Sequence, residues 1–433
     1  MIETDHPLAG LTVLDLGIIT AGAATSQVFA DFGADVIKIE SVTYTDPFRK
    51  WSQVAGAADG TGAPTSSTSS PPFESVNRGK HGVALDLKTP IGRQVFLDLV
   101  RDADIVVENF RRGVLERLGI DFDALRAVNP RIILLSLSSQ GTTGPESTYI
   151  SFGSPLEALG GTMAITGYGP DEPPLWTGNN VNYPDQLVSY LAPGLALAAL
   201  RAREATGEAI HIDAAQREAV TSVVGETIVE HSATGASPRP IGNRHPHFAP
   251  QGIYRTDGDD EWVAISVQSD AQWRALVSLP ELFDLGDDRG LDESAGRRAA
   301  HDHLDEVLAA FCRASNRHVL AERLQELGVP ASAVLRPSEV LHDPQLEALG
   351  FHTVVDSEPI VQRGFLAHLL PQGGEIARRA PGLGEHTTEI LRSRLNYDLN
   401  QIHDLHRSGA IYCAELTSES GLTTVRTPAS ATR

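Results

Sequence analysis

The chain has 433 residues, of which 41% are hydrophobic and 21% charged, so at about 150 residues per domain it has the length of two to three domains. Its 35 Lys and Arg residues against 56 Asp and Glu residues give a formal net charge of −21, which argues against non-specific binding of nucleic acid or an anionic membrane. Its two cysteines, Cys312 and Cys413, exclude a disulfide framework and a Cys-rich zinc site and fit a reducing compartment.

Targeting and membrane signals are weak. The N-terminal segment MIETDHPL lacks the basic and apolar regions of a secretory leader. The longest apolar stretch, 187–200, is shorter than the ~20 residues of a membrane span and contains Pro193. We therefore expect a buried helix there, and a cytoplasmic protein without membrane or nucleic-acid partners.

The first forty residues predict a βαβ unit, which implies a parallel sheet. A buried strand at 11–17 is followed by a helix at 19–33 and a strand at 34–40. Three further βα steps follow, with strands at 82–87, 104–110 and 131–138 and helices at 90–100, 113–118 and 122–128. The near-continuous apolar character of the last strand is typical of the interior of a parallel sheet.

The remainder of the chain changes character twice. An insertion at 55–72, rich in Ser, Thr, Gly, Ala and Pro, predicts a mobile surface segment. A helix at 183–203, a strand at 208–213 and a long helix at 214–232 then lead into a separate α+β region. In that region we expect two strands joined by a hairpin turn at 257–260, followed by helices at 270–277, 294–314 and 317–327.

Familiar cofactor and metal motifs are missing. The turn after the first strand reads GIITAGAA, with Gly17 and Gly22 five apart, so the dinucleotide fingerprint is absent although Glu40 ends the second strand. These glycines predict a tight turn packed closely on the helix. His245 and His247 are spaced to present two metal ligands from a loop, but packing of that loop is the favoured interpretation. The serine-hydrolase elbow and the phosphate-binding P-loop are also absent.

Asp185 begins an otherwise apolar helix and has two interpretations. From the residue alone, helix capping is favoured, since Asp suits an N-terminus. The functional interpretation is a carboxylate nucleophile, whose anion a helix N-terminus stabilises. The Gly-rich segment upstream, with Tyr168 and Trp176, would wall a substrate against that carboxylate; core packing of these aromatic residues is the alternative.

Basic residues gather at two places in this acidic chain and are candidates for binding a phosphate-bearing ligand, with solvated surface as the alternative. They are Arg78, Lys80 and His81 in NRGKHG, and Arg111, Arg112 and Arg117 in NFRRGVLERLG.

Several segments together resemble the class III CoA-transferases, the CaiB/BaiF family, which includes formyl-CoA transferase, carnitine CoA-transferase and the 2-methylacyl-CoA racemases. They run in family order from Pro7 to about Leu391 and cover nearly the whole chain. The segments are PLAGLTVLDLG, FADFGADVIKIE, ALDLKTPIGR, DADIVVENFRRGVLERLGID, NPRIILLSLS, YPDQ, GNRHPHFAPQGIYRT and APGLGEHTTEIL.

This resemblance implies an α/β fold: a Rossmann-like large domain with a parallel sheet built from both chain ends, a smaller α+β domain, and an interlocked homodimer. The expected ranges are 1–215 for the first part of the large domain, 216–234 for a linking helix, 235–327 for the small domain, 328–395 for the return to the large domain, and 396–433 for a partly flexible tail.

The resemblance also implies the reaction. The family nucleophile is an Asp at the position of Asp185, which attacks an acyl-CoA thioester to give a mixed anhydride and then an aspartyl-CoA thioester. An acceptor acid runs these steps in reverse, so CoA moves from one carboxylic acid to another. Coenzyme A is the co-substrate, and no metal, NAD or flavin is needed.

Binding residues carry over by position. The implied CoA contacts are Thr20 and Ala21 beside the thioester, Lys80 and Arg117 at the nucleotide phosphates, Asn109 and Phe110 at the adenosine, and the loop from Ser138 to Gly141, with Arg78 or Arg49 as substitutes for basic residues that this chain lacks. For the acyl group and the acceptor acid we expect Tyr168 and Trp176, with Met163, and Arg244 and His245.

Departures from the family pattern bear on substrate and reaction. Ala23 replaces a proline of the first turn, Thr20 stands where formyl-CoA transferase has Gln, and Ser41 and Ser138 replace basic residues. Formyl and oxalyl substrates are therefore not expected. Phe152 stands at the position of the racemase histidine, which favours a transferase. The alternatives are a 2-methylacyl-CoA racemase and a non-catalytic CoA-binding subunit of a heteromer.

Overall fold

The computed structural model describes residues 6–51, 70–151, 153–178, 181–355, 360–365 and 376–419, together with 367, 369, 373 and 374. The chain forms two compact units. The large unit comprises 1–162, 177–229 and 350–433, and the small unit comprises 163–176 and 230–349. The range expected for the small domain, 235–327, falls inside the small unit.

The large unit is built on a seven-stranded sheet with the order β12-β3-β2-β1-β4-β5-β6. Its strands are β1 (Thr12–Asp15), β2 (Asp35–Glu40), β3 (His81–Leu85), β4 (Ile105–Glu108), β5 (Ile133–Ser136), β6 (Ile210–Asp213) and β12 (Ile411–Tyr412). All pairs are parallel except β12 with β3. The expected α/β class and parallel-dominated sheet are thereby confirmed. The strand order reverses between β1 and β4, which is where ligands bind in open α/β sheets.

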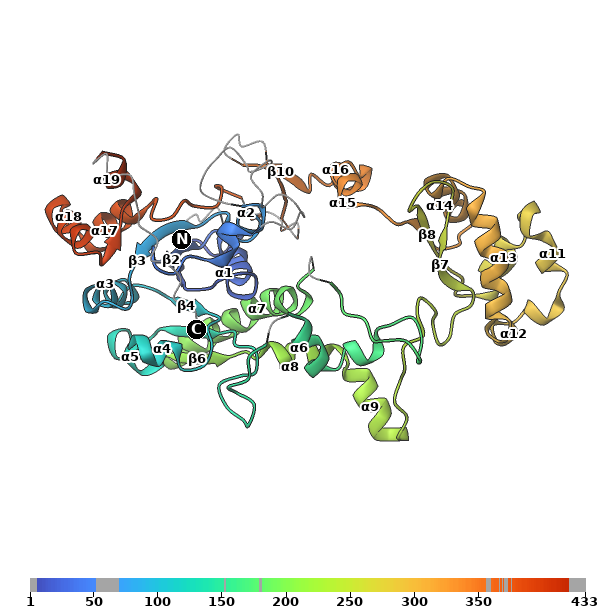
Figure 1. The fold of residues 1–433 in the computed structure, drawn as a ribbon, viewed down its shortest axis with the longest axis horizontal. Helices are drawn as coiled ribbons and strands as arrows, with labels where there is room; N and C mark the ends of the chain where they lie inside the picture. The colour runs from blue at the N-terminus through green and yellow to red at the C-terminus, as the bar shows by residue number, and fades with distance from the viewer. Residues whose placement is uncertain are drawn as a thin grey trace, which may run out of the picture. The chain divides into compact units, whose positions relative to one another are not determined.

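Helices cover both faces of this sheet (Figure 1). On one face, strand residues such as Leu14 and Val106 pack with α3 (Pro90–Val100), α5 (Phe122–Val128), α17 (Thr387–Leu395) and α18 (Leu399–Arg407). On the other face, Val13 and Ile105 pack with α1 (Ala21–Asp31) and α7 (Tyr183–Thr206). Burial on both faces is why these strands are continuously apolar in sequence.

Shorter elements complete the large unit: α2 (Pro71–Asn77), α4 (Val114–Leu118), α6 (Gly153–Gly160), α8 (Gln216–Val223), and the hairpin of β10 (His352–Val354) with β11 (Val361–Arg363). A 3₁₀ turn spans Pro47–Lys50. The predicted insertion at 55–72 lies almost wholly outside the described residues, which resume at Ser70 just before α2.

Two helices differ from the sequence-based expectation. The long helix predicted at 214–232, and with it the single linking helix 216–234, is wrong: α8 ends at Val223 and α9 (Gly225–Thr234) begins after a break at Val224. Val and Gly are weak helix formers, so the break occurs where they adjoin. The helix predicted at 294–314 is likewise divided, into α12 (Ser294–Ala299) and α13 (His301–Arg313).

The C-terminal segment is more structured than the expected tail. Helix α18 starts in a reciprocal capping box between Asp398 and Gln401, and its Ile402 is buried. Strand β12 then pairs Ile411 with Leu85 of β3, and α19 (Ala414–Glu419) follows. Part of the range 396–433 therefore belongs to the sheet. Residues 420–433 lie outside the described part.

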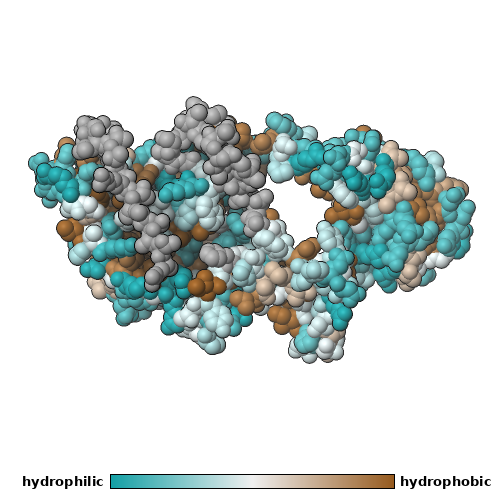
Figure 2. All heavy atoms as spheres, in the orientation of Figure 1, coloured by the Kyte–Doolittle hydropathy of each residue, from teal (hydrophilic) through white to brown (hydrophobic). Residues whose placement is uncertain are grey.

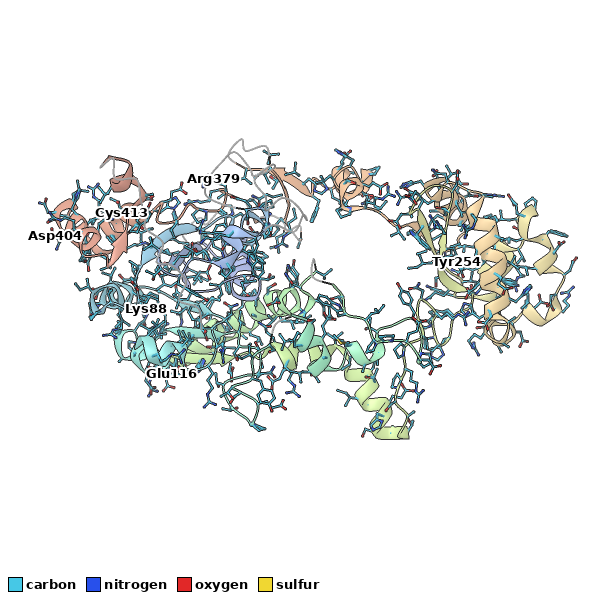
Figure 3. The ribbon with its side chains drawn as sticks, in the orientation of Figure 1. Lys88, Glu116, Tyr254, Arg379, Asp404 and Cys413 are labelled. Carbon is cyan, nitrogen blue, oxygen red and sulfur yellow. The ribbon has the colours of Figure 1, made fainter. Side chains whose placement is uncertain are left out.

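The small unit carries a three-stranded antiparallel sheet of β7 (Gln251–Arg255), β8 (Trp262–Ser266) and β9 (Ala331–Ala333). The predicted hairpin is confirmed. Trp273, Leu304 and Leu320 form a core with the sheet. They come from α10 (Asp270–Leu276), α13 and α14 (Arg317–Glu326). Tyr254, labelled in Figure 3, donates a 2.8 Å hydrogen bond from β7 to Asp305 of α13.

The remaining elements of the small unit are short: α11 (Phe283–Gly286), α15 (Pro337–Val340), α16 (Pro344–Ala348), and 3₁₀ turns at Met163–Ile165, Pro280–Leu282 and Arg289–Leu291.

Helix α7 is apolar on its outer side as well as its inner side. Val188, Ala192 and Ala196 are buried, whereas Tyr190 and Leu191 are 45% and 46% exposed.

Figure 2 shows mostly hydrophilic residues on the visible face, with apolar residues in scattered groups. Across the described residues, none of the helices combines the length and apolar character that a membrane crossing requires.

Candidate active site

Asp185 is the third residue of α7, so it is not the N-cap. The cap position belongs to Asn182, which has a left-handed backbone and makes no side-chain capping bond. The half-buried Asp185 carboxylate lies beside its own backbone N–H, the backbone N–H of Ala21 and the side chain of Gln216, and all three favour its ionised form. The first of these satisfies a helix-end donor, as the capping interpretation requires, but the other two come from different helices.

Four helices begin around this carboxylate. Ala21 opens α1, Gln216 opens α8 and Gly153 opens α6; a Cβ on Gly153 would lie 3.9 Å from Asp185 Oδ2. The amino ends of helices carry partial positive charge and unpaired N–H groups, which favour an anion there. The same groups stabilise an oxyanion that develops beside the carboxylate.

The basicity of Asp185 is set by opposing effects. Burial raises its pKa to about 6, against the hydrogen bonds from Ala21, its own N–H and Gln216, which act to lower it. The group is therefore mostly ionised at neutral pH and more basic than an ordinary Asp, as suits a nucleophile.

Thr20 and Ala21, both expected at the thioester, lie beside Asp185. Thr20 is buried, and Asn182 Nδ2 lies 3.4 Å from its hydroxyl. The preceding turn is as tight as its glycines predicted: a Cβ on Gly17 would lie 2.4 Å from the carbonyl carbon of Gly22. Glycine is needed at both Gly17 and Gly22, because a side chain at either position would prevent the close contact between this turn and the first turn of α1.

Asn109 and Phe110 follow β4, and Asn109 contacts the same turn. Asn109 Oδ1 accepts from the Ile18 N–H at 2.8 Å, and Asn109 Nδ2 donates to the Ile18 carbonyl at 3.0 Å. Phe110 is half-buried against the apolar core, and its N–H donates to Glu108 at 2.7 Å. The two strand ends that flank the reversal of strand order are thus tied together.

Arg78 and Lys80 are buried, contrary to their surface appearance in the sequence. Lys80 Nζ lies 2.8 Å from each of Asp15 Oδ2, the Ala23 carbonyl and Asn77 Oδ1. Arg78 forms a two-point ion pair with Asp31, with bonds of 3.1 and 2.7 Å. Protein groups therefore engage the donors that were expected to hold CoA phosphates.

The other basic cluster faces solvent. Arg111, Arg112 and Arg117 are all exposed around α4, near Glu116, which Figure 3 labels. Arg112 bonds Ser147, whereas in the described part of the chain Arg117 forms no ion pair. After the neighbouring β5, Ser138 accepts a 3.0 Å bond from the Gly141 N–H, and Gly141 has a φ of 85° that favours glycine.

The remaining predicted site residues belong to the small unit. Tyr168 and Trp176 are 65% and 39% exposed, so the core-packing alternative is wrong for both. Arg244 forms ion pairs with Asp302 and Asp305.

His245 and His247 interact within their own loop. The ring of His245 stacks on Phe248 at 4.2 Å, and its Nδ1 accepts from the His247 N–H at 3.1 Å. Among the described residues, no three His, Cys, Asp or Glu side chains are grouped as metal ligands. Phe152, at the racemase histidine position, lies outside the described residues.

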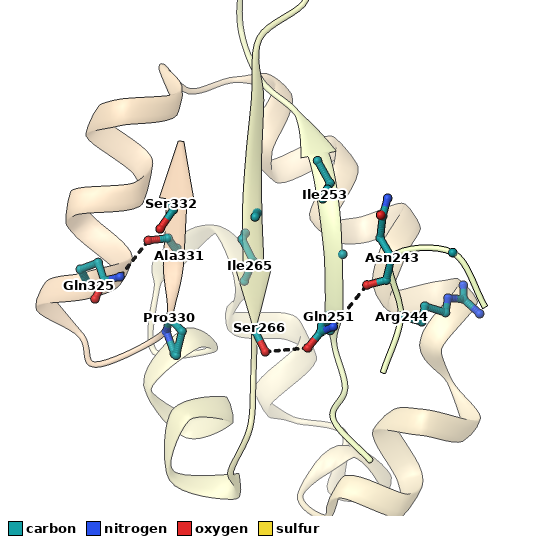
Figure 4. A pocket seen from close by; sticks show the side chains of 13 residues that line it. Asn243, Arg244, Gln251, Ile253, Ile265, Ser266, Gln325, Pro330, Ala331 and Ser332 are labelled. Carbon is teal, nitrogen blue, oxygen red and sulfur yellow. Dashed lines mark hydrogen bonds between the residues drawn. The ribbon is translucent and has the colours of Figure 1, made fainter. Parts of the chain in front are cut away.

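A hollow of about 480 Å³ opens on the three-stranded sheet of the small unit. Figure 4 shows Gln251 and Ser266 bonded to each other across it, and Gln325 bonded to the Ala331 carbonyl. Arg244 and Asn243 border it. Its lining mixes polar and apolar residues, and apart from Arg244 it contains none of the predicted site residues.

Sequence reasoning missed Gln216. Its buried side chain lies just past the carboxyl end of β6, and this position at the edge of a parallel sheet is the signal that would have selected it.

The large unit has an α/β fold with a parallel-dominated sheet, and the candidate carboxylate lies beside Ala21, which follows one of the two strands at which the strand order reverses. The CoA-transferase family III model matches residues 8–387, and the chain belongs to this family of CoA-transferases.

Relatives and solved structures agree with this assignment. The chain is 33% identical to a succinyl-CoA–D-citramalate CoA-transferase of Chloroflexus aurantiacus, covering 90% of this chain and 94% of the relative. It is 30% identical to a succinate–glutarate CoA-transferase of Agrobacterium fabrum, covering 89% and 95%. A probable CoA-transferase of Mycobacterium tuberculosis is 32% identical over 95% of this chain, which spans 51% of that relative's length. The crystal structure of a CaiB/BaiF family protein from Brucella suis superposes with a TM-score of 0.82 at 30% identity, covering 90% of this chain and 100% of that one.

Proposed function

We propose that this enzyme moves CoA from an acyl-CoA donor to a carboxylic acid through covalent intermediates on Asp185. The observation that carries the proposal is the Asp185 carboxylate, which lies beside Ala21 and Gln216 where four helices begin. Its raised pKa strengthens it as a nucleophile, and the helix ends offer N–H donors for the negative charge that develops on an attacked carbonyl.

The proposed steps balance without a further reactant. A carboxylate oxygen of Asp185 attacks the thioester carbon, the C–S bond breaks, and CoA leaves as the thiolate. The product is a mixed anhydride between the acyl group and Asp185. The thiolate then attacks the Asp185 carbonyl carbon, giving an aspartyl-CoA thioester and releasing the donor acid. An acceptor carboxylate repeats both steps in reverse order.

For CoA binding we propose the exposed cluster around α4 together with the segments after β4 and β5. Arg117 supplies an exposed guanidinium for phosphate, which Arg favours through paired N–H donors. Asn109 and Phe110 precede Arg117 in the chain and follow β4. The Ser138–Gly141 loop follows β5, which pairs with β4. Arg78 and Lys80 are left out of this set because their donors are engaged.

For the substrates we propose succinyl-CoA as donor and a small dicarboxylic acid as acceptor. The support is the activities named for two relatives, a succinyl-CoA–D-citramalate CoA-transferase and a succinate–glutarate CoA-transferase. Tyr168 and Trp176 remain the proposed pocket residues because their side chains are accessible. Arg244 and His245 stay proposed as acceptor contacts, although Arg244 is already paired with two carboxylates.

We also propose a homodimer. The middle of helix α7 exposes large apolar side chains on its outer face, and an apolar helix face is normally buried. A second copy of the chain would cover its outer face, which includes Tyr190, Leu191, Leu195 and Leu197.

The proposal is tested with Asp185→Ala, using Asp123→Ala as the matched control because Asp123 is an exposed Asp in the first turn of α5. With succinyl-CoA and glutarate, Asp185→Ala should lose activity at least about 10³-fold while still binding CoA, and the control should keep wild-type activity. Full activity of Asp185→Ala contradicts the mechanism. Exchange of the acyl α-proton with deuterated water, without any acceptor acid, would instead identify a racemase.

A further inference from the structure

The turn that precedes Ala21, whose backbone N–H lies beside Asp185, contains a strained residue. Ile19 has a φ of 59°, a left-handed conformation that β-branched residues rarely adopt. Such a conformation is energetically unfavourable and persists only where the surrounding structure holds it. Ile19 lies two positions before Ala21, so relaxation of its backbone would displace that N–H.

Side chains from four separate segments hold this turn. Asp15 accepts from the Gly17 N–H at 2.8 Å, and Lys38 Nζ donates to the Gly17 carbonyl at 2.7 Å. Asn109 bonds both backbone groups of Ile18. Asp46 accepts from the Ile19 N–H at 3.1 Å. Every amide N–H of the turn before Thr20 is thereby engaged by a side chain.

The charged members of this set are buried and balanced. The side chains of Lys38, Asp46, Asp15 and Lys80 are all 0% exposed. Lys38 Nζ lies 3.2 Å from Asp46 and 3.9 Å from Asp15, and Lys80 lies 2.8 Å from Asp15. Two lysines thus face two aspartates. Burial acts against the charge of Lys38, but Asp46 and Asp15 outweigh it and raise its pKa.

A buried ion cluster of this kind contributes little net stability, because desolvation offsets the attraction between the charges. Its contacts with the backbone of the turn therefore need another explanation. Each charged group that contacts the turn forms a hydrogen bond with a backbone atom of the turn. The cluster therefore fixes the backbone conformation of the turn.

We infer that Lys38 and Asp46 are positioning residues, which hold the Gly17–Ile19 turn in its strained form so that the Ala21 N–H meets the Asp185 carboxylate. The inference rests on the proposed function of Asp185. Neither side chain has an exposed atom, so neither contacts substrate, and both act only through the turn.

The chain offers a matched control at the opposite end of β1. Asp104 is paired with Arg203 at 2.9 Å and accepts a 2.9 Å bond from the Thr12 N–H. This partly buried ion pair also holds a backbone N–H of the same strand, but away from the turn. Asp104→Asn therefore reports what loss of such an ion pair does to stability alone.

The experiment compares the full-length variants Lys38→Met, Asp46→Asn, their double variant and Asp104→Asn. The double variant removes both charges together, so it stays foldable if an unpaired buried charge unfolds a single variant. Peptide-resolved hydrogen exchange over residues 16–22 reports on the turn. Steady-state kinetics with succinyl-CoA and glutarate separate kcat from KM.

In the Lys38 and Asp46 variants we expect the turn amides to exchange at least about 10-fold faster. We expect kcat to fall about 10- to 100-fold with little change in the KM for acyl-CoA, because a misplaced catalytic group slows the chemical step. Asp104→Asn should change neither. Unchanged exchange over 16–22, or equal losses of kcat in Asp104→Asn, would overturn the inference. Failure of the proposed function is distinguishable from failure of this inference. If the wild-type enzyme forms no covalent intermediate on Asp185, the proposed function fails, but the effect of the variants on hydrogen exchange over residues 16–22 can still be measured.

Discussion

The backbone N–H of Ala21, the first residue of α1, lies beside the carboxylate of Asp185, the third residue of α7, and favours its ionised form. The two helices pack side by side on one face of the sheet. Their amino ends therefore meet at the edge of the sheet, and a carboxylate placed there is stabilised as an anion by two helix ends at once.

The acid limb of the pH–rate profile should report Asp185. Because burial raises its pKa to about 6 and only the ionised form attacks, kcat/KM should rise tenfold per unit below pH 6 and level off above it. The measurement is kcat/KM from pH 4.5 to 8.5. A limb near pH 4, the ordinary range of Asp, would contradict the assignment.

Asp185→Asn should make the protein more stable at neutral pH. The carboxyl has a pKa of about 6 when folded and 3.8 ordinarily, so folding takes up a proton between these values. The ionised group therefore destabilises the fold above pH 6, by an amount on the order of 1–3 kcal/mol after allowance for its partial exposure.

Urea unfolding at pH 8 and at pH 4 tests this expectation. The Asn variant should gain stability at pH 8 and lose that gain at pH 4. Asp123→Asn, at an exposed helix position, serves as the control and should show no such dependence. Equal stabilities of wild type and Asp185→Asn at pH 8 would show that burial of the carboxylate has no energetic consequence.

Gln216→Leu removes a donor to the nucleophile while keeping the side-chain volume. Because that bond lowers the pKa of Asp185, the acid limb should move to higher pH, and kcat should fall about 10-fold as one donor to the reacting group is lost. Gln94→Leu, which removes an exposed hydrogen bond on α3, should leave the profile in place. A limb that does not move would exclude Gln216 from the site.

Arg117→Gln tests the proposed phosphate contact. An exposed guanidinium that binds a phosphate contributes affinity for CoA but not to the chemical step, so KM for acyl-CoA should rise about 10-fold with kcat unchanged. Arg126→Gln, an exposed arginine of α5, is the matched control. With dephospho-CoA thioesters the effect should shrink if Arg117 binds the 3′-phosphate, and an unaltered KM would remove Arg117 from the CoA site.

Gly17→Ala should disrupt the turn. Its new Cβ would lie 2.4 Å from the backbone of Gly22, so the turn must move, at an expected cost above about 2 kcal/mol of stability and with a loss of kcat. Gly169→Ala, where no atom lies within 4 Å of the new Cβ, should change stability by less than about 0.5 kcal/mol. Thermal unfolding and kinetics of both variants check this.

The sequence predicted β1 to β5 because strands buried on both faces need apolar runs, whereas β6 is half-exposed and was predicted from the short segment 208–213. It did not predict β12, since two residues carry no periodic signal and their pairing with β3 depends on a segment distant in the chain. Strand order was also beyond reach, so only the resemblance indicated that both chain ends build one sheet.

Asp185 is conspicuous in the sequence as a lone carboxylate at the start of an apolar helix, but the residue alone favours a helix cap, and only the resemblance implies a nucleophile. Lys80 was misjudged for the opposite reason: in NRGKHG it resembles a surface residue, and nothing local reveals that Asp15 and Asn77 enclose it. Lys38 was overlooked within an apolar strand for the same cause. Burial of a charge is decided by partners from other segments, which a single sequence does not pair.

The most direct test of the central claim is the mass of the intact wild-type enzyme after incubation with succinyl-CoA and quenching with hydroxylamine, followed by peptide mapping. The account predicts a hydroxamate on Asp185 that depends on the donor and disappears when glutarate is added first. Turnover of the same preparation with no modification of Asp185, or with modification at another residue, would contradict it.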